Sequence, residues 1–202
     1  MAKLVSLIKR DWPKLLLLAG IFVMGIWLGE QLPRVNPKAA SELREMAMER
    51  FKEIAAWMRR LPLGTGFLII WINNINASLT AILLGVLLPV MPLTFLIMNG
   101  VLIGLFQNIT ELENGISPLR FYLSLAPHGL LELPAFFIAV FLGIRLGLIP
   151  YRLIIHYLRT KEHLPLIKEA LREVGHYGVL IIIMLFLAAL IEVSVSPLLL
   201  GL

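Results

Sequence analysis

A histidine and a glutamate lie four residues apart in the middle of an apolar run. His128 and Glu132 belong to the segment LAPHGLLELPAFFIAVFLGIRLG, residues 125–147. Residues i and i+4 share one face of a helix, so the two side chains can share a proton, bind a cation or form a hydrogen bond. An ionised side chain in hydrocarbon costs roughly 2.5–3.5 kcal/mol. We therefore expect this pair to face protein or water.

Two prolines flank the pair. Pro127 suits the first turn of a helix and predicts a helix start near this residue. Pro134 lacks the N–H that would bind the carbonyl oxygen of Leu130, so this oxygen is a free acceptor beside Glu132. The prolines therefore open the backbone where the titratable pair lies, a pattern found where membrane helices line a cavity.

Further polar residues occur inside other apolar runs, and four interpretations of the set stay open. The pair can lock the bundle through hydrogen bonds to a neighbouring helix, at about 0.6–2 kcal/mol per bond. It can also form a proton or ion path, a metal site or a catalytic site. The metal candidates are His128, Glu132 and Glu192, a thin ligand set. We expect no cofactor and assign no catalytic residue. The expected polar core cluster or ion path is Asn74, Asn99, His128, Glu132 and Glu192.

The composition predicts that these residues lie in a membrane. Of the 202 residues, 59% are hydrophobic and 15% charged, and the mean hydropathy is +0.88. A soluble domain has about 45–50% apolar and about 25% charged residues. The absence of cysteine excludes disulfides, thiolate metal sites and thiol nucleophiles. Basic residues flank the apolar runs, so we expect the lipid bilayer, and no nucleic acid, as the surroundings.

The elements that must position the pair are all helical. We predict an all-α, polytopic transmembrane helical bundle in a single membrane domain, residues 1–202. Amphipathic helices at the membrane surface are expected at about 37–60 and 151–174, and a short re-entrant helix at 119–126. A small excess of basic residues predicts a cytoplasmic N-terminus and an external C-terminus in the cell membrane. The five predicted spans are about 14–32, 65–88, 91–107, 127–148 and 176–200.

Small residues indicate where helices approach one another. The spacings Gly100-x-x-x-Gly104 and Gly143-x-x-x-Gly147 permit close backbone contact, within the bundle or at a dimer interface. The glycine spacings therefore leave a homo-oligomer as one alternative, with a dimer as its simplest form. Gly129, with the two prolines, is expected to disturb the helix or serve packing, and Arg145 is expected at the membrane interface.

The motif PHGLLELPA at 127–135, with NG at 99–100, GIRLG at 143–147 and ALIE at 189–192, resembles the stage II sporulation protein M family. The resemblance implies a polytopic protein with a cytoplasmic N-terminus. In sporulating bacteria this type of protein anchors two peptidoglycan-degrading partners at the membrane, and some relatives are encoded near transporter components. It implies no catalytic role. The shared residues are Asn74, Asn99, Gly100, Pro127, His128, Gly129, Glu132, Pro134, Arg145 and Glu192.

Two functions follow as expectations, and neither is enzymatic. The first is a membrane scaffold or anchor for membrane or cell-envelope proteins, in which the polar cluster is structural. The alternative is a channel or transporter for a small ion or proton, with the cluster as its path. The two differ in whether changing Glu132 to Gln removes a measurable flux.

Overall fold

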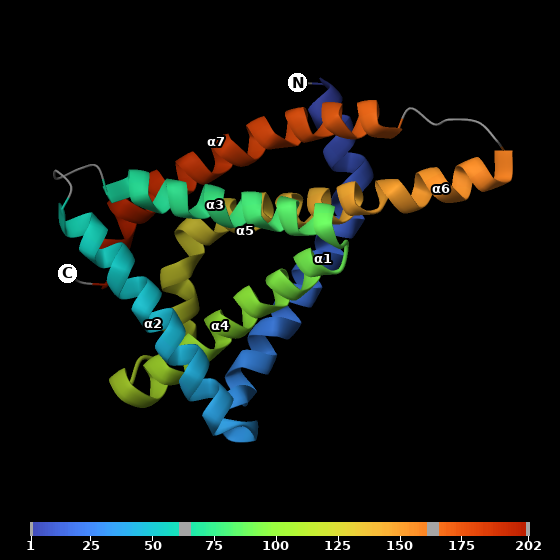
Figure 1. Cartoon of the computed structure of the whole chain (residues 1–202). Helices are drawn as coiled ribbons and strands as arrows, with labels where there is room; N and C mark the ends of the chain where they lie inside the picture. The colour runs from blue at the N-terminus through green and yellow to red at the C-terminus, as the bar shows by residue number, and fades with distance from the viewer. Residues whose placement is uncertain (1, 61–65, 161–165, 201–202) are drawn as a thin grey trace.

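The computed structural model describes residues 2–60, 66–160 and 166–200, which form α-helices throughout, joined by short turns. Five of the helices are long and apolar enough to cross a membrane: α1, α3, α4, α5 continued by α6, and α7. The predicted all-α, polytopic fold is therefore confirmed. The helices are α1 (Ala2–Val35), α2 (Pro37–Arg60), α3 (Gly66–Leu87), α4 (Met91–Asn114), α5 (Pro118–Gly147), α6 (Ile149–Thr160) and α7 (Leu166–Leu200) (Figure 1).

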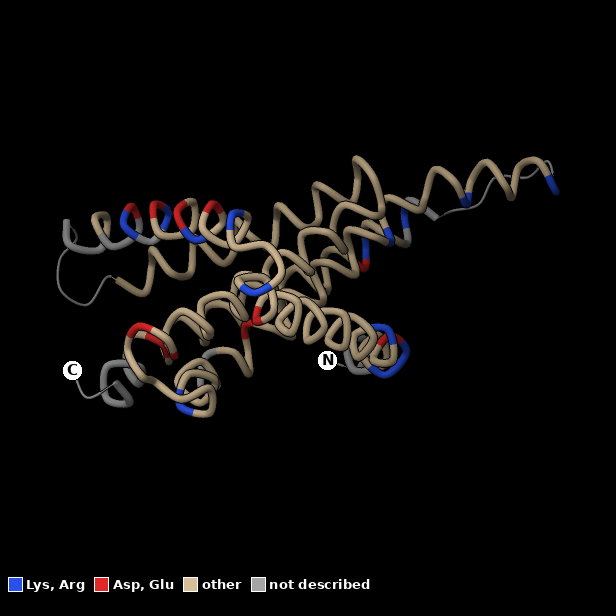
Figure 2. Tube along the Cα trace, turned by 90° about the horizontal axis from the view of Figure 1, so that it is seen from below, with Lys and Arg blue, Asp and Glu red and all other residues tan. Residues whose placement is uncertain are grey.

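The bundle has two groups of helices. One group is the pair α1 and α4, and the other is α3, α5 and α7, which pack side by side (Figure 1). The surface helix α2 runs obliquely from the end of α1 to the start of α3, so that it spans the two groups. Charges gather along α2 and toward the ends of the bundle, whereas most of the length of the long helices carries none (Figure 2). This distribution fits an apolar slab with polar surfaces.

Glycine lets the backbones of α1 and α4 touch. A Cβ atom added at Gly100 would lie 2.6 Å from the carbonyl oxygen of Phe22, and one added at Gly104 would overlap the backbone of Ile26. Gly25 and Gly29 make the same approach from the α1 side. In lipid, helices gain little from the hydrophobic effect, so such close van der Waals contact is a main source of association.

The second glycine contact joins α3 to α5. A Cβ atom at Gly85 would overlap the backbone of Gly143, and one at Gly147 would overlap the backbone of Gly85. Both motifs predicted from sequence therefore pack within one chain. Gly129 differs, because a Cβ atom there would meet only a side-chain atom of Leu133 at 3.9 Å. Its expected packing role is wrong.

The region around the PHG motif forms one helix. α5 is helical from Pro118 to Gly147, so the predicted separate re-entrant helix at 119–126 and the helix start at Pro127 are wrong. A proline inside a helix removes one hydrogen bond and bends the axis without necessarily ending it. α5 accordingly changes direction along its length (Figure 1).

Three other boundaries differ from the prediction. The first candidate span covers Ser6–Val35 rather than about 14–32, within a helix that begins at Ala2. α4 continues through the polar connector and ends where Gly115 adopts a φ of 65°, the left-handed conformation that glycine favours at a helix end. Residues 166–174 are the first turns of α7, and only 151–160 of the predicted second surface helix lie in α6. Its middle, residues 161–165, lies outside the described residues.

We expect the substitution Gly85→Ala to destabilise the bundle, because its methyl group must displace the backbone of Gly143. Overpacking of this kind costs about 1–3 kcal/mol. Gly178→Ala is the control, since no atom lies within 4 Å of its added Cβ, and alanine is favoured over glycine in a helix by about 1 kcal/mol. Thermal unfolding in detergent micelles measures both. Equal melting temperatures would contradict the close contact.

Candidate functional site

Glu132 lies where three cavities meet. It lines an apolar cavity of about 430 Å³, a small cavity of about 80 Å³ and a large polar cavity of about 780 Å³. Ile103 of α4 also lines all three. The carboxyl group of Glu132 is therefore half-buried with open space around it, which fits the expectation that it faces protein or water.

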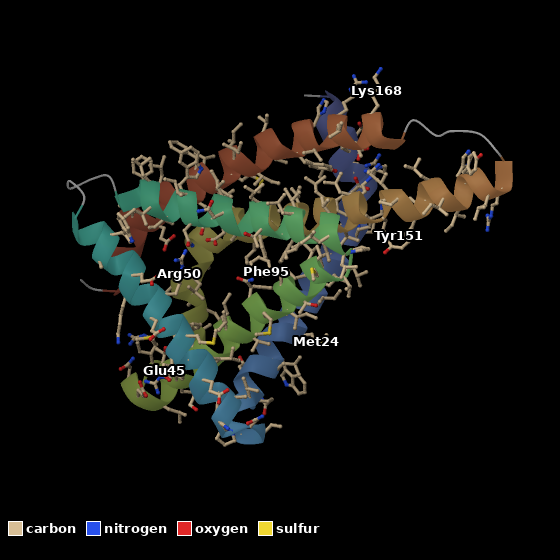
Figure 3. The ribbon with its side chains drawn as sticks, viewed as in Figure 1. Met24, Glu45, Arg50, Phe95, Tyr151 and Lys168 are labelled. Carbon is tan, nitrogen blue, oxygen red and sulfur yellow. The ribbon has the colours of Figure 1, made fainter. Side chains whose placement is uncertain are left out.

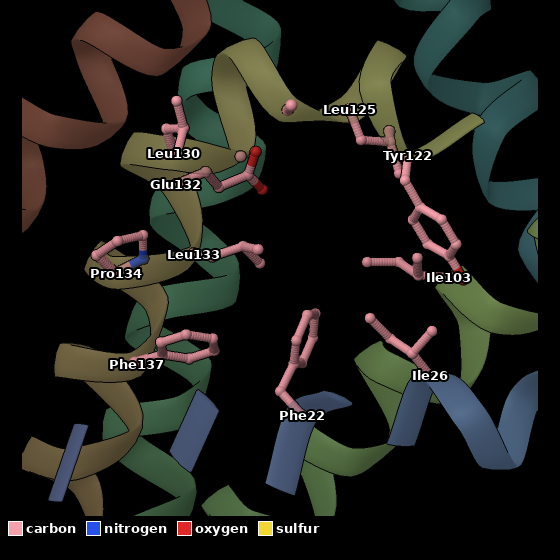
Figure 4. A pocket seen from close by; sticks show the side chains of 12 residues that line it. Phe22, Ile26, Ile103, Tyr122, Leu125, Leu130, Glu132, Leu133, Pro134 and Phe137 are labelled. Atoms are coloured by element: carbon pink, nitrogen blue, oxygen red, sulfur yellow. The ribbon is translucent and has the colours of Figure 1, made fainter. Parts of the chain in front are cut away.

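The apolar cavity lies between α5 from Gly129 onward and a wall formed by α1, α4 and the preceding turns of α5. In Figure 4, Glu132, Leu133 and Phe137 project into it from one side, and Tyr122 and Ile103 from the other. Gly129 lines the same space, so its missing side chain enlarges the cavity. The Tyr122 hydroxyl donates a 2.6 Å hydrogen bond to Glu30 of α1. Burial and this carboxylate raise the pKa of Tyr122, so the tyrosine stays neutral and holds the cavity wall in place.

The large cavity contains most of the polar cluster. It is framed by α2, α3, α4, α5 and α7, and its polar lining residues are Arg50, Asn73, Asn74, Asn99, Glu132 and Glu192.

Two carboxyl groups face one guanidinium in the large cavity. Glu132 and Glu192 are close enough to interact electrostatically. Arg50, which α2 places next to α3 (Figure 3), is already paired with Glu53 at 3.2 Å. The lining therefore has an excess of negative charge, which favours a cation or a shared proton.

The small cavity connects the two helix groups at the same level. Its polar lining residues are Asn74, Ser78, Asn99 and Glu132. Among the described residues, none hydrogen-bonds to the buried hydroxyl of Ser78. A volume of about 80 Å³ holds two water molecules at roughly 30 Å³ each, and a polar wall is what such waters need. The volume and the polar wall leave room for water beside Glu132.

Asn74 and Asn99, the two asparagines of the predicted cluster, form hydrogen bonds within their own helices. The Asn99 amide donates to the carbonyl oxygen of Phe95 at 2.8 Å, and Asn73 donates to Asn74 at 3.5 Å. Among the described side chains, no hydrogen bond joins Asn74 or Asn99 to Glu132. A bond from either amide to His128 stays a prediction, because that side chain lies outside the described residues.

The other member of the pair, His128, lies in the helical backbone of α5, but its side chain is outside the described residues, as is that of Pro127. The predicted His128–Glu132 contact and the metal set of His128, Glu132 and Glu192 thus stay predictions. Within the described part of the chain, no three histidine or carboxylate side chains converge as a metal site.

A second polar cluster, which the sequence interpretation missed, lies at the other end of the bundle. The Asp11 side chain is fully buried and accepts hydrogen bonds from Lys14 at 2.9 Å and from the buried Tyr177 at 3.0 Å. It also pairs with Arg10. The signal was present in KRDWPK, where an acidic residue stands between cations at the start of an apolar run.

This second cluster extends to α5 and α7 through Glu173. Arg10 contacts one oxygen of Glu173 at 3.1 Å, and Arg145 forms an ion pair with the other. Arg145 is 22% exposed and lies near the end of α5. The pairs let α7 start with charged turns and continue into the membrane without a break.

Comparison with known proteins agrees with this architecture. The family described as Stage II sporulation protein M matches residues 15–197. The chain belongs to this family. It is a multi-pass membrane protein, and the family match covers four of the candidate spans completely and the first from residue 15 onward.

One relative is an uncharacterised protein of Methanocaldococcus jannaschii. It is 33% identical over 103 residues, which are 50% of this chain and 54% of the relative. The chain thus matches about half the length of that protein. No solved structure shows significant similarity. Of the ten shared residues, Asn74, Asn99, Glu132 and Glu192 line the large cavity, Gly100 and Arg145 make helix contacts, and Gly129 and Pro134 line the apolar cavity. The side chains of the other two, Pro127 and His128, lie outside the described residues.

We expect the substitution Asp11→Ala to destabilise the protein by about 2–3 kcal/mol, because it leaves the buried Tyr177 hydroxyl without its acceptor. Tyr177→Phe removes only the donor and should cost about 1 kcal/mol. The double variant should cost less than the sum, since both changes remove one bond. Denaturation in detergent micelles measures each value. Glu42→Ala, on the exposed face of α2, is the control, and additive effects would contradict the bond.

We also expect water in the large cavity. The chain has no cysteine, so a single introduced thiol can report on its own surroundings. Leu102→Cys lines the cavity and should react with a membrane-impermeant cationic thiosulfonate at least tenfold faster than Leu96→Cys, because that reagent needs water and the thiolate. Leu96 lies on the same helix and is 0% exposed. Equal rates would show that the cavity is dry.

Proposed function

We propose that the chain binds a small cation or a proton within the membrane and belongs to a transport system, with Glu132 as the central group. The observation that carries the proposal is the meeting of three cavities at this carboxyl group. Intramembrane ionisable residues that face a wet cavity are typical of ion and proton pathways. The excess negative charge of the lining supports a cationic or protonic ligand over an anion.

The route is open on one side of Glu132 and closed on the other. The large cavity lies beside α2, whose charged face is exposed. Beyond Glu132, the centre of the bundle is filled by buried residues with no exposed surface, among them Ala81, Leu96 and Ala139. Such an arrangement supports a binding site reached from one side, as in one state of a transporter, rather than an open pore.

A scaffold or anchor for membrane or cell-envelope proteins is the second candidate. It is favoured by α6, which extends from the bundle (Figure 1) and exposes large apolar residues on its surface, Tyr151 at 52% and Leu158 at 66% among them. Such a helix suits the membrane interface or a partner protein. In this case the Glu132 cluster has only a structural role. A homo-oligomer stays compatible with either candidate.

The variant Glu132→Gln separates the two candidates. We expect purified protein in liposomes to dissipate a proton, Na⁺ or K⁺ gradient, measured with an entrapped fluorescent indicator. Glutamine keeps the size of the side chain but cannot carry the charge or release the proton, so the rate should fall at least tenfold. This loss corresponds to about 1.4 kcal/mol or more in the barrier.

The matched control is Glu45→Gln, which makes the same change on α2 at a residue that is exposed and lines no cavity (Figure 3). Its flux should equal that of the wild type. Two results would contradict the proposal: wild-type flux no faster than that of empty liposomes, which the scaffold predicts, or equal flux in Glu132→Gln and wild type.

A further inference from the structure

A fourth cavity, separate from the three around Glu132, lies at the opposite end of the bundle. It has a volume of about 500 Å³ and lies between α1 and α5, with the first turn of α4 and the start of α6 at its edges. Its wall consists of basic side chains and apolar side chains. The basic residues are Arg10, Lys14, Arg145 and Arg152, and the apolar residues are Leu17, Leu18, Ile21, Leu93, Phe141, Ile144 and Leu148.

The basic and apolar residues are separated along the cleft. On α1 the order is Arg10 and Lys14, then the leucines and Ile21, all at helical spacing on one face. On α5 and α6 the order is reversed, from Phe141 to Arg152. The basic ends of the two stripes coincide, because Arg10 and Arg145 both pair with Glu173. Arg10 and Ile21 are separated by about 16 Å of helix, so the apolar part can accommodate much of an acyl chain.

Charge at the basic end is not balanced by the protein. The four cations face two carboxylates, Asp11 and Glu173, which pair with Arg10, Lys14 and Arg145. The cleft therefore keeps two positive charges. Arg152 is exposed, and no ion pair joins it to another described residue. The Lys14 ammonium is held 5.3 Å from the centroid of the Phe141 ring, where the charged and apolar parts meet.

We propose that this cleft is a binding site for an anionic phospholipid. The phosphate lies among Arg10, Lys14, Arg145 and Arg152, and one acyl chain extends along Leu17, Ile21 and Ile144. Basic pockets between membrane helices bind anionic headgroups in this way. The apolar cleft distinguishes a lipid from a free phosphate ion, because only the lipid uses both parts of the wall.

The experiment uses the full chain in detergent micelles, with phosphatidylglycerol or phosphatidylcholine added and bound lipid counted by native mass spectrometry. Wild type should retain phosphatidylglycerol in preference to phosphatidylcholine. Arg152→Gln should weaken phosphatidylglycerol binding roughly fivefold, the contribution of one basic side chain near an anionic lipid, and Arg152→Lys should restore most of it. Arg152 is chosen because its loss leaves the Asp11 and Glu173 pairs intact.

Arg159→Gln is the matched control, since it removes the same charge from an exposed residue of the same helix that does not line the cleft. It should bind phosphatidylglycerol like the wild type. Inorganic phosphate alone should leave the melting temperature unchanged. The proposal is overturned by equal retention of the two lipids, by equal losses in Arg152→Gln and Arg159→Gln, or by stabilisation with phosphate equal to that with phosphatidylglycerol.

Discussion

The architecture depends on two places where helix backbones touch. Glycines bring α1 against α4 and α3 against α5, and each contact fixes one group of helices. In a membrane this contact replaces the hydrophobic effect that drives soluble proteins together. The two groups meet at the buried centre and diverge toward α2, and the cavities around Glu132 lie where they diverge. The open space of the site is thus a consequence of the tight contacts elsewhere.

The two polar clusters differ in how the charge of their central carboxyl group is compensated inside the membrane. Asp11 has no exposed surface, and two cations and a tyrosine hydroxyl satisfy its oxygens. This arrangement is typical of a structural group, because buried charge without partners is costly. Glu132 instead interacts with a second carboxyl, Glu192, across cavity space. A like-charged neighbour adds to the cost of ionisation, which is the opposite of the arrangement around Asp11.

Much of the fold could be predicted from sequence, since long apolar runs must form helices in lipid. The α2 bounds agree with the predicted helix at 37–60, because a proline start and mixed charges mark its limits. The features that the sequence did not predict depend on contacts with residues far away in the chain. Nothing local indicates that α7 begins at Leu166, since its charged turns are satisfied by Arg10 and Arg145 from other helices. Likewise, Glu132 could be predicted as a candidate because it is a carboxyl group inside an apolar run. The three cavities around it could not be predicted, because they depend on how distant helices pack.

Helix α5 lines both the acidic cavity and the basic cleft, and α7 carries Glu192 at the first and Tyr177, the partner of Asp11, near the second. On α5, Glu132 and Arg145 are thirteen residues apart, or about 20 Å of helix. On α7, Tyr177 and Glu192 are fifteen residues apart, or about 22 Å. A hydrocarbon core is about 30 Å thick, so helices that cross it place the two sites in opposite halves of the bilayer. If the positive-inside rule orients the basic cleft toward the cytoplasm, the Glu132 cavity must open toward the outside. The predicted cytoplasmic N-terminus and the proposed access to Glu132 from outside therefore form a single hypothesis. If the N-terminus were external, the Glu132 cavity would open toward the cytoplasm.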